Sequence, residues 1–290
     1  LLGVAFVTDP ATSDVAWVPA AALAAGAAAA LAAHPRVRGH NVKALMRGLL
    51  AGGHELRGLE LDTAIAAYLI DPAEARYELA DLVEKYTPFV APAASAAAAK
   101  GQLDLDGTGL TSAQQAGRDA LAVHHVAAPI VASLEAQGMA ELYRTIENPL
   151  VVVLARMEHV GVGVDTEALR GINRRLTDEA EQLVARLREV AGRPDLNLNS
   201  PIQLRELLFE QRKLTAPGLK KTKTGYSTDA QTLAKLADQW PEFIEPLLRH
   251  REVEKLRSTY GEGLLAEVAA DGRIHATFNQ TVARTGRLSS

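Results

Sequence analysis

The chain has 290 residues, with 31 lysines and arginines and 35 aspartates and glutamates. The resulting net charge of −4 argues against a uniformly basic surface that would coat nucleic acid, but it permits local basic patches. Its length suffices for two domains. The absence of cysteine excludes disulfides and thiolate metal sites, which favours a reducing cytoplasm, and no apolar run approaches the length that spans a bilayer.

The first half alternates strand-like and helical segments. Two short β-prone runs, 3–7 and 14–18, flank an Asp-Pro turn and predict a hairpin, and the alanine-rich run 20–33 predicts a helix that ends before Pro35. Further strand candidates lie near Val37 and at 59–63, and helical spacing of apolar residues recurs at 42–49, 64–69, 79–86, 112–126 and 129–134. This alternation predicts an α/β or α+β layer.

Residues 87–111 show no periodicity and predict a surface loop or a partly disordered insert. The acidic residues of this half could in principle bind metal ions, since two-metal nucleases need several converging carboxylates. The candidates are Asp62, Asp71, Asp81, Asp104, Asp106 and Asp119. Turn, helix and loop positions account for most of them without a metal, so no metal site is predicted here.

The second half begins with a long amphipathic helix. Asp165 is a good N-cap, an apolar stripe runs from Leu169 to Val190, and Gly192 with Pro194 ends the helix. At ~1.5 Å per residue, about 25 residues span roughly 38 Å, and a helix of that length usually pairs with another.

Three more local signals follow along the chain. Ser200, Pro201 and Gln203 fit a capping box, Thr228 with Gln231 can cap a short helix, and Pro241 starts the last helix. Over residues 193–257, 12 lysines and arginines against 9 aspartates and glutamates give a local charge of +3. This excess predicts a surface that faces a polyanion, although an ordinary solvated helical hairpin fits the same pattern.

The C-terminal stretch alternates apolar and polar residues over 273–280, which predicts a half-buried strand. Arg284, Thr285, Gly286 and Arg287 then form a turn in which glycine permits close approach and arginine suits phosphate oxygens or base edges. A solvated, arginine-rich hairpin end is the alternative. The motif stops at Ser290, and we expect the groups that it serves to follow.

Four ordered stretches together identify a family resemblance. They are Asn197-Leu198-Asn199-Ser200, Lys221-Thr222-Lys223-Thr224-Gly225-Tyr226-Ser227-Thr228, Leu256-Arg257-Ser258-Thr259-Tyr260 and Thr285-Gly286-Arg287-Leu288-Ser289-Ser290. In this order and spacing they resemble the bacterial DNA polymerase I family, the family A DNA polymerases. The resemblance implies an RNase H-like α/β domain of 3′–5′ exonuclease type over 1–143, an all-α thumb with long antiparallel helices over 144–269, and a short β segment of the polymerase palm over 270–290.

The same resemblance implies the DNA-binding residues. Asn197, Asn199, Ser200, Ser227, Thr228, Arg251 and Arg257 match positions that contact the DNA backbone, and Arg287 matches an arginine that reaches the minor groove near the primer terminus. Neighbouring basic and hydroxyl side chains complete the predicted set, namely Lys221, Lys223, Lys255, Ser258, Thr259 and Arg284. No catalytic residue is expected within the chain.

The exonuclease positions depart from the pattern of active members. Residues 39–45 are Gly-His-Asn-Val-Lys-Ala-Leu where active members have Gly-Gln-Asn-Leu-Lys-Tyr-Asp, so Leu45 replaces a metal-binding aspartate. In the later Tyr-x-x-x-Asp motif, Asp119 stands at the tyrosine position and Val123 at the aspartate position. Leucine and valine cannot ligate a hard cation, so we expect a proofreading domain without nuclease activity.

The implied function is DNA-directed DNA synthesis in replication and repair, with primer–template DNA and dNTP as partners of the intact enzyme. Mg²⁺ is expected outside this segment, bound by carboxylates beyond Ser290, and no metal within it. We expect a monomer in the bacterial cytoplasm, associated with the nucleoid and not with a membrane. Two alternatives stay open: an active 3′–5′ exonuclease and a stand-alone, non-catalytic DNA-binding module.

Overall fold

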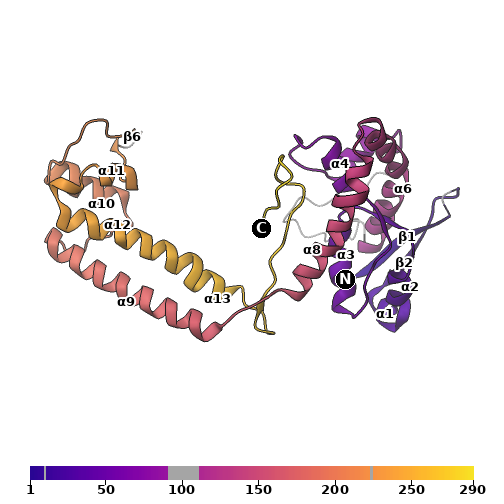
Figure 1. Ribbon diagram of the computed structural model, residues 1–290, viewed down its shortest axis with the longest axis horizontal. Helices are drawn as coiled ribbons and strands as arrows, with labels where there is room; N and C mark the ends of the chain where they lie inside the picture. Colours follow the sequence, from indigo (N-terminus) through magenta and orange to yellow (C-terminus); the bar gives the residue numbers. More distant parts are fainter. Residues whose placement is uncertain (10, 91–110, 223–224) are drawn as a thin grey trace. The chain divides into compact units, whose positions relative to one another are not determined.

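The computed structural model describes residues 1–9, 11–90, 111–222 and 225–290, so most of the loop expected at 87–111 lies outside the described residues. The chain forms two compact units (Figure 1). The first unit comprises Leu1–Gly161 and His275–Ser290, and the second unit comprises Val162–Ile274. This grouping differs from the ranges 1–143, 144–269 and 270–290 expected from the sequence, because the helix before Gly161 and the C-terminal segment both pack within the first unit.

The first unit contains an antiparallel hairpin and a parallel strand pair. β1 (Gly3–Asp9) pairs with β2 (Asp14–Pro19), as predicted, and β3 (Val37–Gly39) runs parallel to β4 (Leu59–Asp62). The predicted alternation of strands and helices is present. In the described ranges each sheet has two strands.

Helices surround these strands and supply most of the core. They are α1 (Ala20–Ala22), α2 (Ala28–Ala32), α3 (Val42–Ala51), α4 (Thr63–Ile70), α5 (Leu79–Tyr86), α6 (Ser112–Ala136), α7 (Ala140–Leu142) and α8 (Asn148–Val160), with π-helical turns η1 (Leu23–Ala27) and η2 (Tyr143–Glu147). The alanine-rich helix predicted as continuous over 20–33 is broken at Gly26, whose φ of 125° lies in a region that only glycine adopts easily. Every residue from Thr63 to Tyr68 in α4 is buried, which places this helix at the centre of the core.

A single buried carboxylate fixes the start of two helices. Asp62, at the end of β4, is 1% exposed, and its Oδ1 accepts hydrogen bonds from the amides of Asn41 and Ala64 at 3.0 Å each, while its Oδ2 accepts from the amide of Val42 at 2.7 Å. It therefore caps α4 and also satisfies the first amides of α3. Burial raises the pKa of Asp62, and the three amide donors act in the opposite direction.

The C-terminal segment is held by a second buried carboxylate, that of Glu158 on α8. Its side chain is fully buried, and Oε1 lies 2.5 Å from Lys43 Nζ while Oε2 lies 3.2 Å from Arg47 Nη1. The amide of Phe278 donates to Oε1 at 2.8 Å, and Lys43 also donates to the carbonyl of Phe278. Because two cations and an amide offset the cost of burying the charge, Glu158 can join α3, α8 and the C-terminal segment.

The strand predicted over 273–280 was wrong in its length. β8 covers only Arg273–Ile274, and farther along only an isolated bridge pairs Asn279 with Ser289. The predicted alternation of exposure is present only over 277–280, where Thr277 and Asn279 are exposed and Phe278 is partly buried, because residues 273–276 are all partly buried. The ladder ends early because the backbone of Phe278 bonds to side chains of the first unit instead of a neighbouring strand.

The second unit is helical. It contains α9 (Thr166–Ala191), α10 (Pro201–Arg205), α11 (Ala230–Ala234), α12 (Pro241–Leu256) and α13 (Leu264–Ala266), joined by η3 (Glu206–Gln211), η4 (Ala237–Gln239) and η5 (Arg257–Gly263). Two short antiparallel pairs, β5 (Val162–Gly163) with β8 and β6 (Lys221–Thr222) with β7 (Gly225–Tyr226), complete it. Leucines of α9, α10, η3, α11 and α12 form a separate core around Phe243.

The long helix predicted from the sequence is confirmed and has an antiparallel partner. The side chain of Asp165 accepts from the amide of Ala168 at 2.9 Å, and Gly192 ends α9 at a left-handed φ of 63°. Arg249 Nε on α12 lies 2.6 Å from Glu179 Oε1, whereas a Cβ on Gly261 would lie 2.2 Å from Asn173 Oδ1. Partners farther along α12 and η5 therefore lie earlier on α9, which makes the pair antiparallel (Figure 1).

Replacing Asp62 by alanine leaves the amides of Asn41, Val42 and Ala64 without their acceptor. We expect the free energy of unfolding to fall by about 3–5 kcal/mol, measured by urea denaturation. Asp119→Ala is the control, because Asp119 is exposed and accepts one hydrogen bond from Gln115. The free energy of unfolding of this variant should fall by no more than about 0.5 kcal/mol. Equal losses in the two variants would contradict the capping role.

Candidate nucleic-acid interface

The hairpin of β6 and β7 presents lysine at the surface of the second unit. Lys221 pairs with Tyr226 across the hairpin, and its Nζ lies 5.0 Å from the centre of the tyrosine ring. Phe209, which packs against the core of the second unit, contacts the same ring at 4.9 Å between ring centres. Lys221 is exposed, and the predicted Lys223 lies outside the described residues. The aromatic support holds the base of the hairpin while the ammonium group remains at the surface.

The loop before α10 exposes two asparagines by alternation. Leu196 and Leu198 are buried, whereas Asn197, between them, and Asn199, after Leu198, are exposed. The loop is fixed from within, because the Asn199 amide donates to Asn197 Oδ1 at 3.0 Å. Each exposed amide group can still donate to a further acceptor.

Ser200 acts as the cap of α10, as the sequence predicted. Its Oγ accepts from the amide of Gln203 at 3.4 Å. The predicted capping box is incomplete, because the Gln203 side chain accepts from the amide of Asn197 at 2.8 Å and not from that of Ser200. The glutamine thereby ties the asparagine loop to the helix.

Thr228 and Arg251 meet, but as structural partners. Thr228 is 8% exposed, and the guanidinium of Arg251 donates to its carbonyl oxygen. The prediction that Thr228 caps the next helix was wrong by one residue, since the side chain of Asp229 accepts from the amide of Thr232 at 2.8 Å. Ser227 Oγ accepts a hydrogen bond from the Asp229 amide at 3.1 Å. Burial lowers the pKa of Arg251.

Arg257, at the start of η5, is paired on both sides with carboxylates. Its Nη2 lies 3.0 Å from Glu254 Oε2, its Nε lies 3.2 Å from Glu254 Oε1, and Nη1 pairs with Glu262. The hydrogen bond with Glu254 contributes most to raising the pKa of Arg257, and Glu262 acts in the same direction. The guanidinium is therefore already oriented, and a phosphate has to replace a carboxylate to reach it fully.

The remaining predicted residues of this region are exposed. Lys255 projects from the last turn of α12, and Ser258 and Thr259 follow Arg257 in η5. Figure 1 shows β6, α10 and α11 together at one end of the α9–α12 pair, whereas η5 follows the other end of α12. The predicted set thus forms two groups on the second unit.

The arginine turn belongs to the first unit. Arg284 and Arg287 are both exposed, and the guanidinium of Arg284 donates to the carbonyl of Ala73 at 3.2 Å. Gly286, with φ of 74°, provides the left-handed position of the turn. The hydroxyl of Tyr68 contacts the turn from the core, donating to the carbonyl of Ala283 at 2.7 Å.

The positions that the sequence predicts to be degenerate exonuclease residues carry two hydrocarbon side chains and one exposed carboxylate. Leu45 packs against the core and Val123 is 8% exposed within α6, while Asp119 is exposed and accepts from Gln115 Nε2 at 2.8 Å. Both oxygens of Asp62 are engaged by backbone amides. Over the described parts of the chain, no group of three or more histidine, aspartate or glutamate side chains could hold a metal ion.

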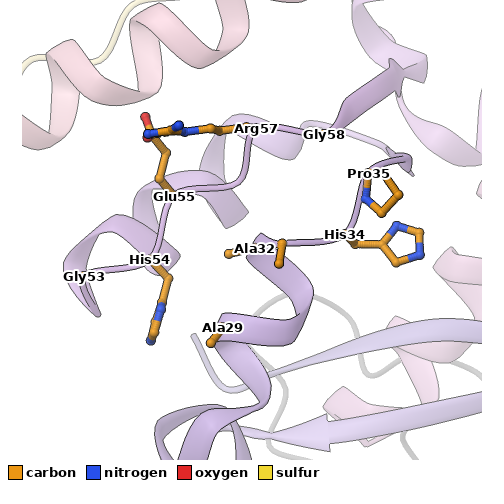
Figure 2. A pocket seen from close by; sticks show the side chains of 10 residues that line it. Ala29, Ala32, His34, Pro35, Gly53, His54, Glu55, Arg57 and Gly58 are labelled. Carbon is orange, nitrogen blue, oxygen red and sulfur yellow. Dashed lines mark hydrogen bonds and ion pairs between the residues drawn. The ribbon is translucent and has the colours of Figure 1, made fainter.

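A pocket of about 520 Å³ lies elsewhere on the first unit, between α2 and the connection from α3 to β4. Figure 2 shows Glu55 and Arg57 side by side at its edge, and the imidazoles of His34 and His54 on different sides. Glu55 is neutralised by Arg57, at 2.6 Å, and by Arg156. None of the sequence-predicted site residues lines this pocket, so it has no part in the predicted interface.

Sequence reasoning missed three residues that organise these sites: Tyr68, Glu158 and Asp229. Glu158 had a detectable signal, because it continues the buried face of Val151, Leu154 and Ala155 on α8, where a charge needs a partner. Tyr68 looked like any core aromatic. Across the described helices, none combines the length and apolar character that a membrane crossing needs.

The chain has clear relatives. Residues 166–290 match the family model described as DNA polymerase family A. DNA polymerase I of Bacillus subtilis (strain 168) is 38% identical over 239 residues, which are 82% of this chain and 27% of that protein. DNA polymerase I of Mycobacterium tuberculosis (strain ATCC 25618 / H37Rv) is 39% identical over 253 residues, 87% of this chain and 28% of that protein. The chain thus spans just over a quarter of the length of these curated relatives.

A solved structure agrees with these matches. The POL domain of Pol1 from M. smegmatis, in complex with DNA primer-template and dNTP, is 34% identical and superposes with a TM-score of 0.77. The match covers 95% of this chain and 46% of that one. The resemblance predicted from the four motifs is confirmed.

Ser200→Ala separates the capping role of this serine from ligand contact. Without the acceptor for the Gln203 amide, we expect the free energy of unfolding to fall by about 1 kcal/mol in urea denaturation. Ser258→Ala is the control, since its exposed hydroxyl only donates to the Lys255 carbonyl at 3.3 Å, and should cost less than about 0.5 kcal/mol. An unchanged stability in Ser200→Ala would mean that the hydroxyl is not needed as a cap.

Proposed function

Because residues 166–290 of this chain belong to DNA polymerase family A, we propose that the chain is part of a DNA-directed DNA polymerase of replication and repair. Its role is to grip the primer–template duplex, and dNTP is the substrate of the intact enzyme. The observation that carries the proposal is that the family match covers almost all of the second unit, which displays exposed amide and lysine side chains in the first two of the four motifs. The Pol1 neighbour, described with primer-template and dNTP, supports the same partners.

We assign the thumb to the second unit, Val162–Ile274, in place of 144–269, because α8 packs within the first unit. Its exposed lysine and arginine side chains suit the phosphates of a duplex. When such cations displace the counterions condensed on DNA, they give a binding affinity that does not depend on the DNA sequence. Lys221 and Lys255 supply charge, and Asn197 and Asn199 supply neutral donors to phosphate oxygens. Phosphate contacts of this kind fix the register of a protein on DNA.

Arg257 has a distinct part in this grip. Glu254 and Glu262 hold its guanidinium in one orientation before DNA arrives. A phosphate that replaces one carboxylate binds the Arg257 guanidinium through two hydrogen bonds. Because the side chain is already ordered, this contact costs little additional conformational entropy. The carboxylates weaken binding by competing for the guanidinium, and they also make the contact selective for a strong anionic acceptor.

The first unit is, on this proposal, an RNase H-like domain of 3′–5′ exonuclease type that has no nuclease activity. Its strand and helix alternation is compatible with that fold, and the hydrocarbon side chains of Leu45 and Val123 cannot bind Mg²⁺. The donor set therefore does not fit a metal here, and Mg²⁺ for polymerisation is bound by other parts of the enzyme. We further propose a monomer in the bacterial cytoplasm that acts on nucleoid DNA.

Two arginine variants of the polymerase that carries this chain test the assignment. Arg257→Ala should weaken primer–template binding irrespective of sequence and reduce the slope of log K against log salt by about 1, measured by fluorescence anisotropy. Arg287→Ala should leave that affinity within about twofold and slow primer extension. Glu254→Gln is the matched control for charge, and should tighten binding because one competing carboxylate is removed. Unchanged binding and extension in both arginine variants would refute the proposed function.

Nuclease inactivity has its own test. Purified protein with Mg²⁺ or Mn²⁺ should not shorten 3′-labelled single-stranded DNA on denaturing gels, and Asp119→Ala should not change the result. Metal-dependent degradation that disappears in Asp119→Ala would establish an active exonuclease and reject this part of the proposal.

A further inference from the structure

The turn that carries Arg287 is closed on one tyrosine hydroxyl. Tyr68 Oη donates to the carbonyl of Ala283 at 2.7 Å and accepts from the amide of Gly286 at 3.2 Å. The same Gly286 amide lies 3.3 Å from the Ala283 carbonyl, as in a β-turn. The hydroxyl therefore binds both ends of the four-residue turn, and both bonds depend on a single oxygen atom.

The position of this hydroxyl is set by the core. Tyr68 is 3% exposed in the buried helix α4, and its ring meets that of Tyr77 edge to face, with centres 6.0 Å apart and planes at 87°. Tyr77 is itself fixed, because its hydroxyl donates to the carbonyl of Asp71 at 2.7 Å. An oxygen held in this way has little freedom to follow a moving turn.

Two further contacts fix the same loop without using Arg287. Asn279 and Ser289 exchange backbone hydrogen bonds of 2.7 and 3.1 Å at its base, and Arg284 donates to the Ala73 carbonyl. Arg284 thus has a backbone partner within the first unit, and Arg287, one residue after Gly286, is exposed. The loop is anchored at its base and at its turn, and the exposed guanidinium follows directly after the anchored residue.

We propose that Tyr68 is a positioning residue for Arg287, and that the exonuclease-type unit thereby takes part in DNA synthesis. This inference rests on the proposed role of Arg287 at the primer terminus. The hydroxyl does not touch DNA; it fixes the backbone from which Arg287 extends, so that the guanidinium is placed before the duplex binds. A domain without nuclease chemistry then keeps a function in the polymerase.

The matched pair Tyr68→Phe and Tyr77→Phe tests this in the polymerase that carries the chain. Each variant loses one hydroxyl and keeps its ring, but only the first releases the turn. We expect Tyr68→Phe to slow primer extension at saturating dNTP by about tenfold, with primer–template affinity within about twofold, and Tyr77→Phe to stay within about twofold in both. Trypsin should cleave after Arg284 and Arg287 faster in Tyr68→Phe than in Tyr77→Phe.

A double variant identifies the route of the effect. If Tyr68 acts through Arg287, then Tyr68→Phe with Arg287→Ala extends primers no more slowly than Arg287→Ala alone, within about twofold. Multiplied effects in the double variant, equal effects of the two tyrosine variants, or normal extension by Tyr68→Phe would overturn the inference and leave the proposed function intact. Normal extension by Arg287→Ala would overturn the role of Arg287 and this inference with it.

Discussion

The first unit depends on the carboxylate of Asp62 and on the hydrogen bonds that continue from it. The amide of Asp62 donates to the hydroxyl of Tyr143 at 2.7 Å, that hydroxyl donates to Asn148 Oδ1 at 3.0 Å, and Asn148 Nδ2 donates to the carbonyl of Leu59 at 2.9 Å. Burial raises the pKa of Tyr143, so the hydroxyl keeps the proton that it donates. The carboxyl end of β4 and the starts of α3, α4 and α8 thus converge on one point. Those three helices carry the side chains that anchor the C-terminal segment.

The two units use charge in opposite ways. In the first unit, Glu158 is fully buried between Lys43 and Arg47, where losing one partner would leave an uncompensated charge, so the contact specifies one position for the C-terminal segment. In the second unit, Arg257 pairs with carboxylates at the surface, where such pairs contribute little to stability and can be exchanged. The pairs of Glu158 serve to fix the backbone, whereas the pairs of Arg257 are partly exposed and join residues close in sequence.

Much of the local structure was predictable because its causes lie within a few residues. The cap at Asp165, the end of α9 at Gly192 and the hairpin of β1 and β2 follow from short-range rules, and all three are present. The full strand predicted at 273–280 was not found, because the amide of Phe278 donates to a glutamate 120 residues away. The alternation of apolar and polar residues does not predict a partner so distant in the sequence. The site shows the same limit: motifs identified Arg284 and Arg287 as a pair, but only the fold shows that Arg284 donates to the carbonyl of Ala73, 211 residues away.

The packing of Leu45 and Val123 has a consequence for the history of the chain. If the first unit descends from a nuclease, regaining a ligand at Val123 would place a carboxylate among core side chains without a cation, at a cost of several kcal/mol before any metal could bind. A single reversion is therefore penalised and brings no activity, since the position of Leu45 must revert as well. On the proposed assignment, the packing around Val123 therefore disfavours the return of a metal site.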